Sequence, residues 1–307
     1  MESKYTSTGI KLLHHPRVLD SILRLGRGTP ISLQIAPTSR CNLKCSFCSN
    51  ANRKNHQDLE ISDILRLINR IHIVRTIEFT GGGDPTMYPE ISNLIKECSN
   101  RKLGFITNGI ALKEKLNQRD VNSLHWLRIS MNSLDYVKSV DIPDIKGVLG
   151  FSYVMNDNTN EEILDRLKKH VKKYNPSYVR IVPNCQATYD EQIQNNIMYS
   201  KLIRKWGKPY FYQAKTFSNT KHCYWGYFKP FVLHDGYVYP CSSVVLNSTS
   251  DRYFNEKFRW CKMEDLPYVY EKKMESFDTK NCDHCVFEAQ NNMIDCLMRP
   301  NGMEDFV

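Results

Sequence analysis

The chain has 307 residues, 41% of them hydrophobic, which is enough for one large domain or two modest ones with a real core. It contains no apolar run near the ~18 residues of a membrane span, and its first residues are polar, so we expect a cytoplasmic protein without a membrane segment. The 42 basic residues exceed the 33 acidic ones, which gives a formal charge of +9. This excess fits either an ordinary solvated surface or a polyanionic partner such as a nucleotide or nucleic acid.

Strand and helix patterns alternate along the chain after a leader that spans residues 1–30. In the leader, Pro16 begins a short helix, and the apolar side chains expected to face inward are Val18, Leu19, Ile22 and Leu23. The expected strands span 31–36, 73–80, 103–107, 126–131, 148–155 and 178–182. The expected helices span 58–70, 89–98 and a segment that runs from a capping box at 159–162 to about residue 174.

This alternation predicts parallel βαβ units over residues 31–212, an α/β fold whose functional loops lie at the carboxyl ends of the strands. A polar stretch at 213–222 has the composition of a linker. Residues 223–307 are rich in cysteine and aromatic residues and are expected to form a small C-terminal domain. Within it, Asp235 and Gly236 predict the turn of a hairpin between 231–233 and 237–239, and 267–274 has the pattern of a short helix.

The first expected strand leads into three cysteines, Cys41, Cys45 and Cys48, in a C-x3-C-x2-C run. The chain has eleven cysteines, and C-x2-C spacings without an export signal indicate metal ligation rather than disulfides. Three thiolates are one too few for a closed zinc site, whereas on a 4Fe–4S cluster they leave one iron open. A zinc knuckle with a distant fourth ligand is the alternative.

This run, with Phe47 before its last cysteine, resembles the signature of the radical S-adenosylmethionine (radical SAM) superfamily. The resemblance implies a partial (β/α)6 barrel and a 4Fe–4S cluster on Cys41, Cys45 and Cys48 whose open iron chelates S-adenosyl-L-methionine. It further implies reductive cleavage of that cofactor to a 5′-deoxyadenosyl radical, an external electron donor of the flavodoxin or ferredoxin type, and a position for Phe47 near the adenine.

Small polar residues follow several expected strands. The segment Gly81, Gly82, Gly83 and Asp84 resembles the superfamily's "GGEP" stretch, which contacts the methionine amino group through its backbone, although aspartate stands here in place of glutamate. The resemblance also implies that Asn108, Ser130 and Asn132 contribute to S-adenosylmethionine binding. Ordinary turn and strand-end chemistry is the alternative at each of these positions.

Four more cysteines form a second set in the C-terminal region, and they are Cys223, Cys241, Cys282 and Cys285. The expected hairpin brings Cys223 towards Cys241, and a C-x2-C hook follows. The spacing resembles the SPASM and Twitch extensions of radical SAM enzymes and implies one auxiliary 4Fe–4S cluster, as in a Twitch domain. A structural zinc site on the same cysteines, or replacement of one ligand by Cys261 or Cys296, stays open.

The substrate is suggested only by charge and aromatic content. Basic and aromatic residues interleave over 202–215, around Lys205, Trp206 and Lys208, which suits a nucleotide or nucleic-acid substrate or else a simple helix end. The alternative substrate is a ribosomal peptide, modified by epimerisation, cross-linking or oxidation. Cys185, after the sixth expected strand, is a candidate hydrogen donor in that case. A non-catalytic zinc-binding nucleic-acid protein is the alternative from another class.

Overall fold

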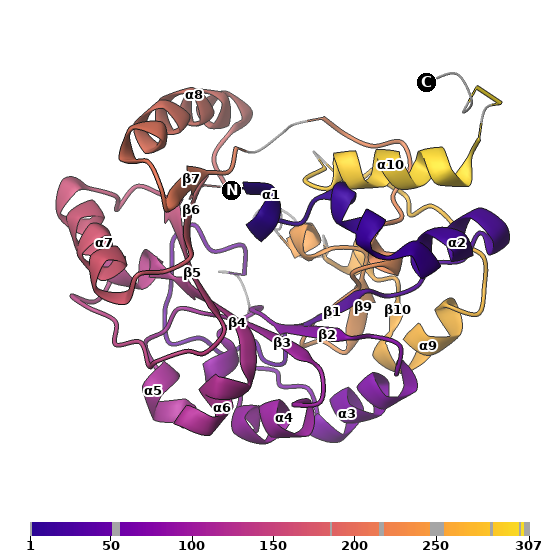
Figure 1. Cartoon of the computed structure of the whole chain (residues 1–307), viewed down its shortest axis with the longest axis horizontal. Coiled ribbons are helices and arrows are strands. Elements are labelled where there is room, and N and C mark those ends of the chain that lie inside the picture. Colours follow the sequence, from indigo (N-terminus) through magenta and orange to yellow (C-terminus); the bar gives the residue numbers. More distant parts are fainter. Residues whose placement is uncertain are drawn as a thin grey trace.

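The structure is a computed structural model, which describes residues 2–50, 56–184, 186–214, 218–245, 255–282, 285–300 and 302–303. Its strands form one sheet in the order β10-β9-β8-β1-β2-β3-β4-β5-β6-β7, curved around a central space (Figure 1). In these described parts of the chain, no helix has the length and apolar character needed to cross a membrane. The α/β class expected from the alternating pattern is confirmed.

Seven parallel strands build the main part of the sheet. They are β1 (Ser32–Ile35), β2 (Thr76–Phe79), β3 (Lys102–Thr107), β4 (Leu124–Ser130), β5 (Val148–Met155), β6 (Tyr178–Pro183) and β7 (Tyr210–Tyr212). The six expected strands are confirmed. The seventh lies inside the basic aromatic stretch, where three consecutive aromatic residues pair with β6 in parallel register.

Helices cover the outer face of this sheet (Figure 1). They are α3 (Ile61–Arg70), α4 (Ile91–Glu97), α5 (Leu112–Lys115), α6 (Gln118–Ser123), α7 (Glu161–Tyr174) and α8 (Tyr189–Trp206), with the 3-10 turns η2 (Pro85–Met87) and η3 (Met131–Asp135). The capping box expected at 159–162 is wrong by one residue, because Asn160 caps α7 by accepting from the Ile163 amide. Thr159 instead accepts from the Asn156 amide.

The C-terminal region continues the same sheet across the stretch expected to be a linker. Its elements are η4 (Trp225–Tyr227), β8 (Phe231–Val232), β9 (Tyr237–Tyr239), η5 (Ser242–Val245), η6 (Asn255–Phe258), β10 (Cys261–Lys262), η7 (Met263–Asp265), α9 (Leu266–Val269) and α10 (Glu288–Met298). The predicted hairpin is confirmed, since β8 and β9 are antiparallel and Gly236 has a φ of 80° that favours glycine. Strand β8 also pairs in parallel with β1.

The N-terminal segment consists of α1 (Glu2–Tyr5), η1 (Gly9–His14) and α2 (Pro16–Leu25). It runs from inside the curve of the sheet, where α1 lies, to the side of α10, where α2 lies (Figure 1). The Tyr5 ring stacks on Tyr178 of β6 with 4.3 Å between centroids, and Gln290 of α10 donates to the Ser7 carbonyl. In α2, Val18 and Ile22 are buried as expected, but the inward prediction for Leu23 is wrong, since its side chain is 63% exposed.

Candidate functional site

The three cysteines of the first motif lie on the loop that leaves the carboxyl end of β1. Cys41, Cys45 and Cys48 are partly exposed and not joined in disulfides, and the Cys48 amide donates to the Cys45 carbonyl at 3.1 Å, which folds the loop back on itself. Burial is the main reason that the pKa of Cys45 is raised to about 11, and the charges of Cys48 and Cys41 contribute to this rise.

The glycine segment after β2 packs backbone to backbone against this loop. A Cβ atom on Gly83 would lie 2.0 Å from the Arg40 carbonyl oxygen, so only glycine fits there. The Asp84 amide donates to the same carbonyl at 2.7 Å. A Cβ atom on Gly82 would lie 2.6 Å from a ring carbon of His234 in the C-terminal hairpin. The glycines thus let the cysteine loop, the β2 loop and the hairpin approach one another.

The side chain of Asp84 braces the ends of β2 and β3. Its buried carboxylate accepts from the amide and hydroxyl of Thr86, from the Thr107 hydroxyl at 2.8 Å and from the Asn108 amide at 2.7 Å. The Asn108 side chain in turn donates to Asn42 at 2.6 Å and lies 3.9 Å from the Cys41 sulfur. The carboxylate therefore has a bracing role, and Asn108 carries its effect to the cysteine loop.

The residues after β4 differ in their surroundings. Ser130 is the last residue of β4 and stays partly exposed. Asn132 is buried, and its carboxamide accepts from the Val154 amide at 2.7 Å and donates to the Val154 carbonyl at 2.9 Å. It also donates to Asp135. A ligand role for Asn132 would require its amide to leave these bonds, so Ser130 is the better placed of the two predicted residues.

The remaining sequence predictions fall at three kinds of place. Phe47 is partly exposed on the cysteine loop. Cys185, the candidate hydrogen donor, lies outside the described residues. Trp206 ends α8, where its ring meets Tyr210 edge-on at 5.1 Å and Lys168 lies 5.1 Å above it, so it serves as a partly buried anchor between α8 and α7.

The four C-terminal cysteines line one cavity, which we call the cysteine cavity. Its lining includes the thiols of Cys223, Cys241, Cys282 and Cys285. Aromatic side chains of Trp225, Phe277 and Phe287 also line it. Burial raises the pKa of Cys223, and the charges of Cys241, Cys285 and Cys282 raise it as well. Neither Cys261 nor Cys296 lines this cavity.

The two donor sets fit the groups that the sequence motifs imply. The cysteine cavity offers four sulfur donors, which suits a 4Fe–4S cluster with all irons ligated. The loop after β1 offers three. Over the ranges that the structure describes, no group of three or more His, Cys, Asp or Glu side chains is arranged to hold a single metal ion.

A larger cavity of about 710 Å³, which we call the barrel chamber, lies on the concave side of the sheet. Its wall includes inward-facing residues of β1, β2, β4 and β6, the N-terminal segment and part of the C-terminal region. The chamber and the cysteine cavity are neighbours, because four residues line both: Trp225, Ser243, Val286 and Phe287. The stacked rings of Trp225 and Phe287, 5.1 Å apart, form part of the shared wall.

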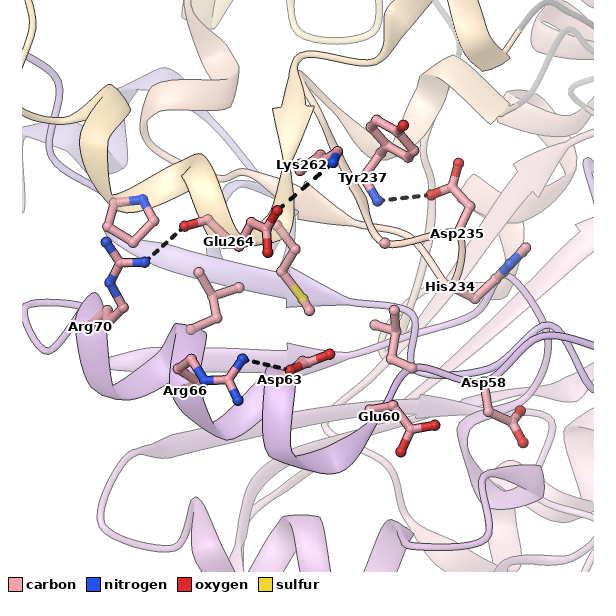
Figure 2. A pocket seen from close by; sticks show the side chains of 15 residues that line it. Asp58, Glu60, Asp63, Arg66, Arg70, His234, Asp235, Tyr237, Lys262 and Glu264 are labelled. Carbon is pink, nitrogen blue, oxygen red and sulfur yellow. Dashed lines mark hydrogen bonds and ion pairs between the residues drawn. The ribbon is translucent and has the colours of Figure 1, made fainter.

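A third groove, of about 380 Å³, separates α3 from the C-terminal hairpin and η7 (Figure 2). Its charged side chains largely satisfy one another, as Figure 2 shows for Arg66 with Asp63 and for Arg70 with the Glu264 carbonyl. Asp58 at its end pairs with Arg40 at 2.9 Å and accepts from Thr38, both next to the cysteine loop. We therefore regard this groove as the packing interface between α3 and the C-terminal hairpin with η7, rather than as a ligand site.

Sequence reasoning missed several residues around these spaces. Arg128 of β4 and Arg180 of β6 line the barrel chamber. The sequence feature that could have revealed them is a charged residue at an inward-facing position of an otherwise apolar strand. Glu78 of β2 pairs there with Lys229 at 2.8 Å. Asn291 is fully buried against Cys285, at 3.7 Å from its sulfur. A buried asparagine in the first turn of α10, after a C-x2-C hook, has no local pattern of its own.

Comparison with curated proteins gives relatives that match part of the chain. Molybdenum cofactor biosynthesis protein 1 of Dictyostelium discoideum is 31% identical over 150 residues, 45% of this chain and 23% of that protein. GTP 3′,8-cyclase of Chlorobaculum tepidum is 31% identical over 126 residues, 39% of this chain and 38% of that enzyme. The chain spans less than half the length of these curated relatives.

Among solved structures, the crystal structure of Streptococcus suis SuiB bound to S-adenosylmethionine has the same fold. It aligns with a TM-score of 0.55 and 15% identity, over 93% of this chain and 79% of that one. The family model described as the Radical SAM superfamily matches residues 35–210, which run from the end of β1 to the start of β7. That match covers more than half of the sequence and contains the three-cysteine loop, and so the chain belongs to the radical SAM superfamily of enzymes.

Proposed function

We propose that the protein reductively cleaves S-adenosyl-L-methionine and abstracts a hydrogen atom from an unactivated C–H bond of a nucleotide substrate. The observation that carries the proposal is the loop with three cysteines at the carboxyl end of β1, in contact with the glycine segment that follows β2. A 4Fe–4S cluster on these thiols, when bound together with S-adenosylmethionine, supplies the 5′-deoxyadenosyl radical.

In this proposal each residue has a defined task. Cys41, Cys45 and Cys48 hold the cluster, since all three lie on the one loop that leaves β1. The backbone of residues 81–83 offers polar groups to the methionine end, since glycine permits close approach. Ser130 at the end of β4 supplies a hydroxyl, and Asn108 positions Cys41.

Two observations support a nucleotide over the other substrate classes. Curated relatives include enzymes named GTP 3′,8-cyclase, from Chlorobaculum tepidum and from Clostridium perfringens. The barrel chamber, moreover, is lined by more cationic than anionic side chains. The likeness to SuiB, solved also with precursor peptide SuiA, lies at 15% identity and supports the fold, so a peptide substrate is the second candidate that the experiment must distinguish.

We further propose one auxiliary 4Fe–4S cluster in the cysteine cavity, held by Cys223, Cys241, Cys282 and Cys285. Four thiolates leave no iron open, which suits electron transfer or positioning better than substrate chelation. The shared wall of Trp225 and Phe287 supports this role, since it separates the cavity from the barrel chamber by two stacked rings.

The test uses anaerobically reconstituted protein with dithionite or a reduced flavodoxin as electron donor. Wild type is expected to form 5′-deoxyadenosine from S-adenosylmethionine, and the triple variant C41A/C45A/C48A is expected to form none. Iron analysis should give about eight irons per chain, and about four in the triple variant. A colourless protein that contains zinc, or undiminished 5′-deoxyadenosine from the triple variant, would overturn the assignment.

The substrate class is tested in the same assay. GTP is expected to accelerate 5′-deoxyadenosine formation and to be consumed, as followed by liquid chromatography and mass spectrometry. Acceleration by a peptide but by no nucleoside triphosphate would instead favour the peptide candidate and contradict the nucleotide proposal.

A further inference from the structure

The lining of the barrel chamber carries an excess of positive charge. The basic residues in it are Lys4, Lys11, His15, Arg128, Arg180 and Lys229. Among the described residues of the lining, Glu78 is the one carboxylate, and it is already engaged by Lys229 at 2.8 Å and by the Gln34 amide at 3.0 Å. The pKa of Lys11 is lowered, mainly by burial and to a smaller extent by the nearby positive charge of Lys229.

The sheet directs two arginines into the same part of this chamber. Arg128 of β4 lies opposite Gly150 of β5, and Arg180 of β6 lies opposite Ser152 of β5. The residues of β5 opposite the two arginines are thus its smallest, and the Tyr178 ring covers Gly150. Burial raises the pKa of the neighbouring Tyr178, while the positive charges of Arg128 and Arg180 lower it.

Three buried polar atoms around the chamber have no hydrogen-bond partner among the described residues. They are Nε of Arg128, Oε1 of Gln213 and Oγ1 of Thr8, on three separate segments of the lining. Buried polar groups in folded proteins are nearly always hydrogen-bonded. All three atoms are shielded from solvent, so a ligand in the chamber would supply their missing partners only after the side chains that carry them rotate towards it.

The size and closure of the chamber limit that ligand to a small molecule. Its volume of about 710 Å³ is within the usual range for small-molecule pockets. The N-terminal segment closes one side, held by the stack of Tyr5 on Tyr178 and by the bond from Gln290 to the Ser7 carbonyl. A nucleic-acid strand would have to displace both contacts to enter.

We propose that the barrel chamber binds a phosphoryl group of a small-molecule substrate, with Arg128 and Arg180 as its principal anchors and Lys11 as a further cation. The inference rests on the proposed function and specifies where and through which residues its substrate is recognised. Guanidinium groups donate in a planar fork that matches phosphate oxygens, and the fork retains its charge at any physiological pH. A phosphoryl group also suits a chamber whose lining carries several cationic side chains.

Calorimetric titration of inorganic tripolyphosphate into the reconstituted full-length protein, with S-adenosylmethionine present, tests this site. We expect binding by wild type and at least a roughly tenfold weakening in R128Q and in R180Q, since a charge-assisted hydrogen bond is worth about 1.5–3 kcal/mol. K11Q changes a residue in the 3-10 turn η1 and should weaken binding several-fold while the variant still folds. R119Q removes an exposed arginine of α6 and is the matched control, with no expected change.

Citrate and a single-stranded DNA oligonucleotide provide the opposing arms. Citrate should bind more weakly than tripolyphosphate, and DNA binding should not respond to R128Q. Failure of wild type to bind tripolyphosphate, tighter binding of citrate, or equal binding by wild type, R128Q, R180Q and K11Q would overturn the assignment. Formation of 5′-deoxyadenosine by wild type is measured on the same sample. If 5′-deoxyadenosine is not formed but tripolyphosphate binds, the proposed function fails and the chamber assignment stands. If 5′-deoxyadenosine is formed but tripolyphosphate does not bind, only the chamber assignment is rejected.

Discussion

The side-chain amide of Asn291 donates towards the sulfur of Cys285 at 3.7 Å, while its oxygen accepts from the amides of Tyr224 and Trp225 at 2.7 and 3.0 Å. One fully buried asparagine of α10 thereby joins a proposed cluster ligand to the start of η4. Hydrogen bonds to ligating sulfur are among the features that set the potential of an iron–sulfur cluster.

We therefore expect N291D to lower the reduction potential of the auxiliary cluster. Aspartate keeps the acceptor for Tyr224 and Trp225 but removes the N–H donor and adds negative charge, both of which disfavour the reduced cluster. A redox titration monitored by electron paramagnetic resonance in the C41A/C45A/C48A background isolates this cluster. N292D, which adds the same charge at the exposed neighbouring position, is the control, and an equal shift in both variants would rule out a role for the hydrogen bond.

Loss of the Asp84 carboxylate should destabilise the fold at the cysteine loop. D84A leaves the buried donors of Thr86, Thr107 and Asn108 without their acceptor, at an expected cost of at least about 1–3 kcal/mol in the free energy of unfolding. Urea denaturation of the cluster-free chain measures it. D63A removes an exposed carboxylate paired with Arg66 and should cost less than about 1 kcal/mol. Similar losses in the two variants would contradict the bracing role.

The ion pair between Glu78 and Lys229 should make stability depend on acid pH. Burial alone would raise the pKa of Glu78, but the ammonium of Lys229 outweighs it and lowers the pKa below its ordinary value of 4.5. The ionised carboxylate therefore stabilises the folded chain above pH 4.5, and this contribution is lost as the pH falls from there through the lowered pKa. E78Q should show a flatter decline of the urea midpoint below pH 4.5. Parallel curves for wild type and E78Q would exclude the effect.

Cys261 and Cys296 should be dispensable for iron binding. Cys261 lies in β10, where burial raises its pKa to about 12, and Cys296 is exposed on α10. C261S and C296S are each expected to keep about eight irons per reconstituted chain, whereas C223S should lose about four. Loss of iron from C261S or C296S would indicate that the ligand set extends beyond the cysteine cavity.

Where the fold could be predicted, the signals were local. Strand β5 has the bounds that its sequence pattern predicted. The hairpin follows from the Asp235-Gly236 turn, whose glycine adopts a positive φ. Helix α8 was missed because its apolar residues do not follow a strong helical period, and only Gln192 and Ile203 are buried in it. Leu23 fits the periodic pattern of α2 but faces solvent, since the surface that α2 packs against is narrower than its apolar stripe.

At the site, cysteine spacing predicted the two ligand sets, because the ligand types and their intervals are themselves the signal, and the four C-terminal cysteines do line one cavity. The surroundings could not be predicted in the same way. The bond of Asn132 to Val154 and that of Asn291 to Cys285 depend on which strand or helix lies alongside. The two inward arginines become one feature only when β5 places them on either side of its small residues.

The parallel pairing of β8 with β1 has a consequence for how the chain folds during its synthesis. Gln34 lies beside Phe231, so one edge of the first strand meets its partner only after most of the polypeptide has left the ribosome. Until then β1 presents unpaired backbone groups along that edge, the kind of surface on which chains associate wrongly. Cells that produce the protein without its last third would therefore be expected to accumulate it in aggregates, however complete the superfamily motif in the remaining part.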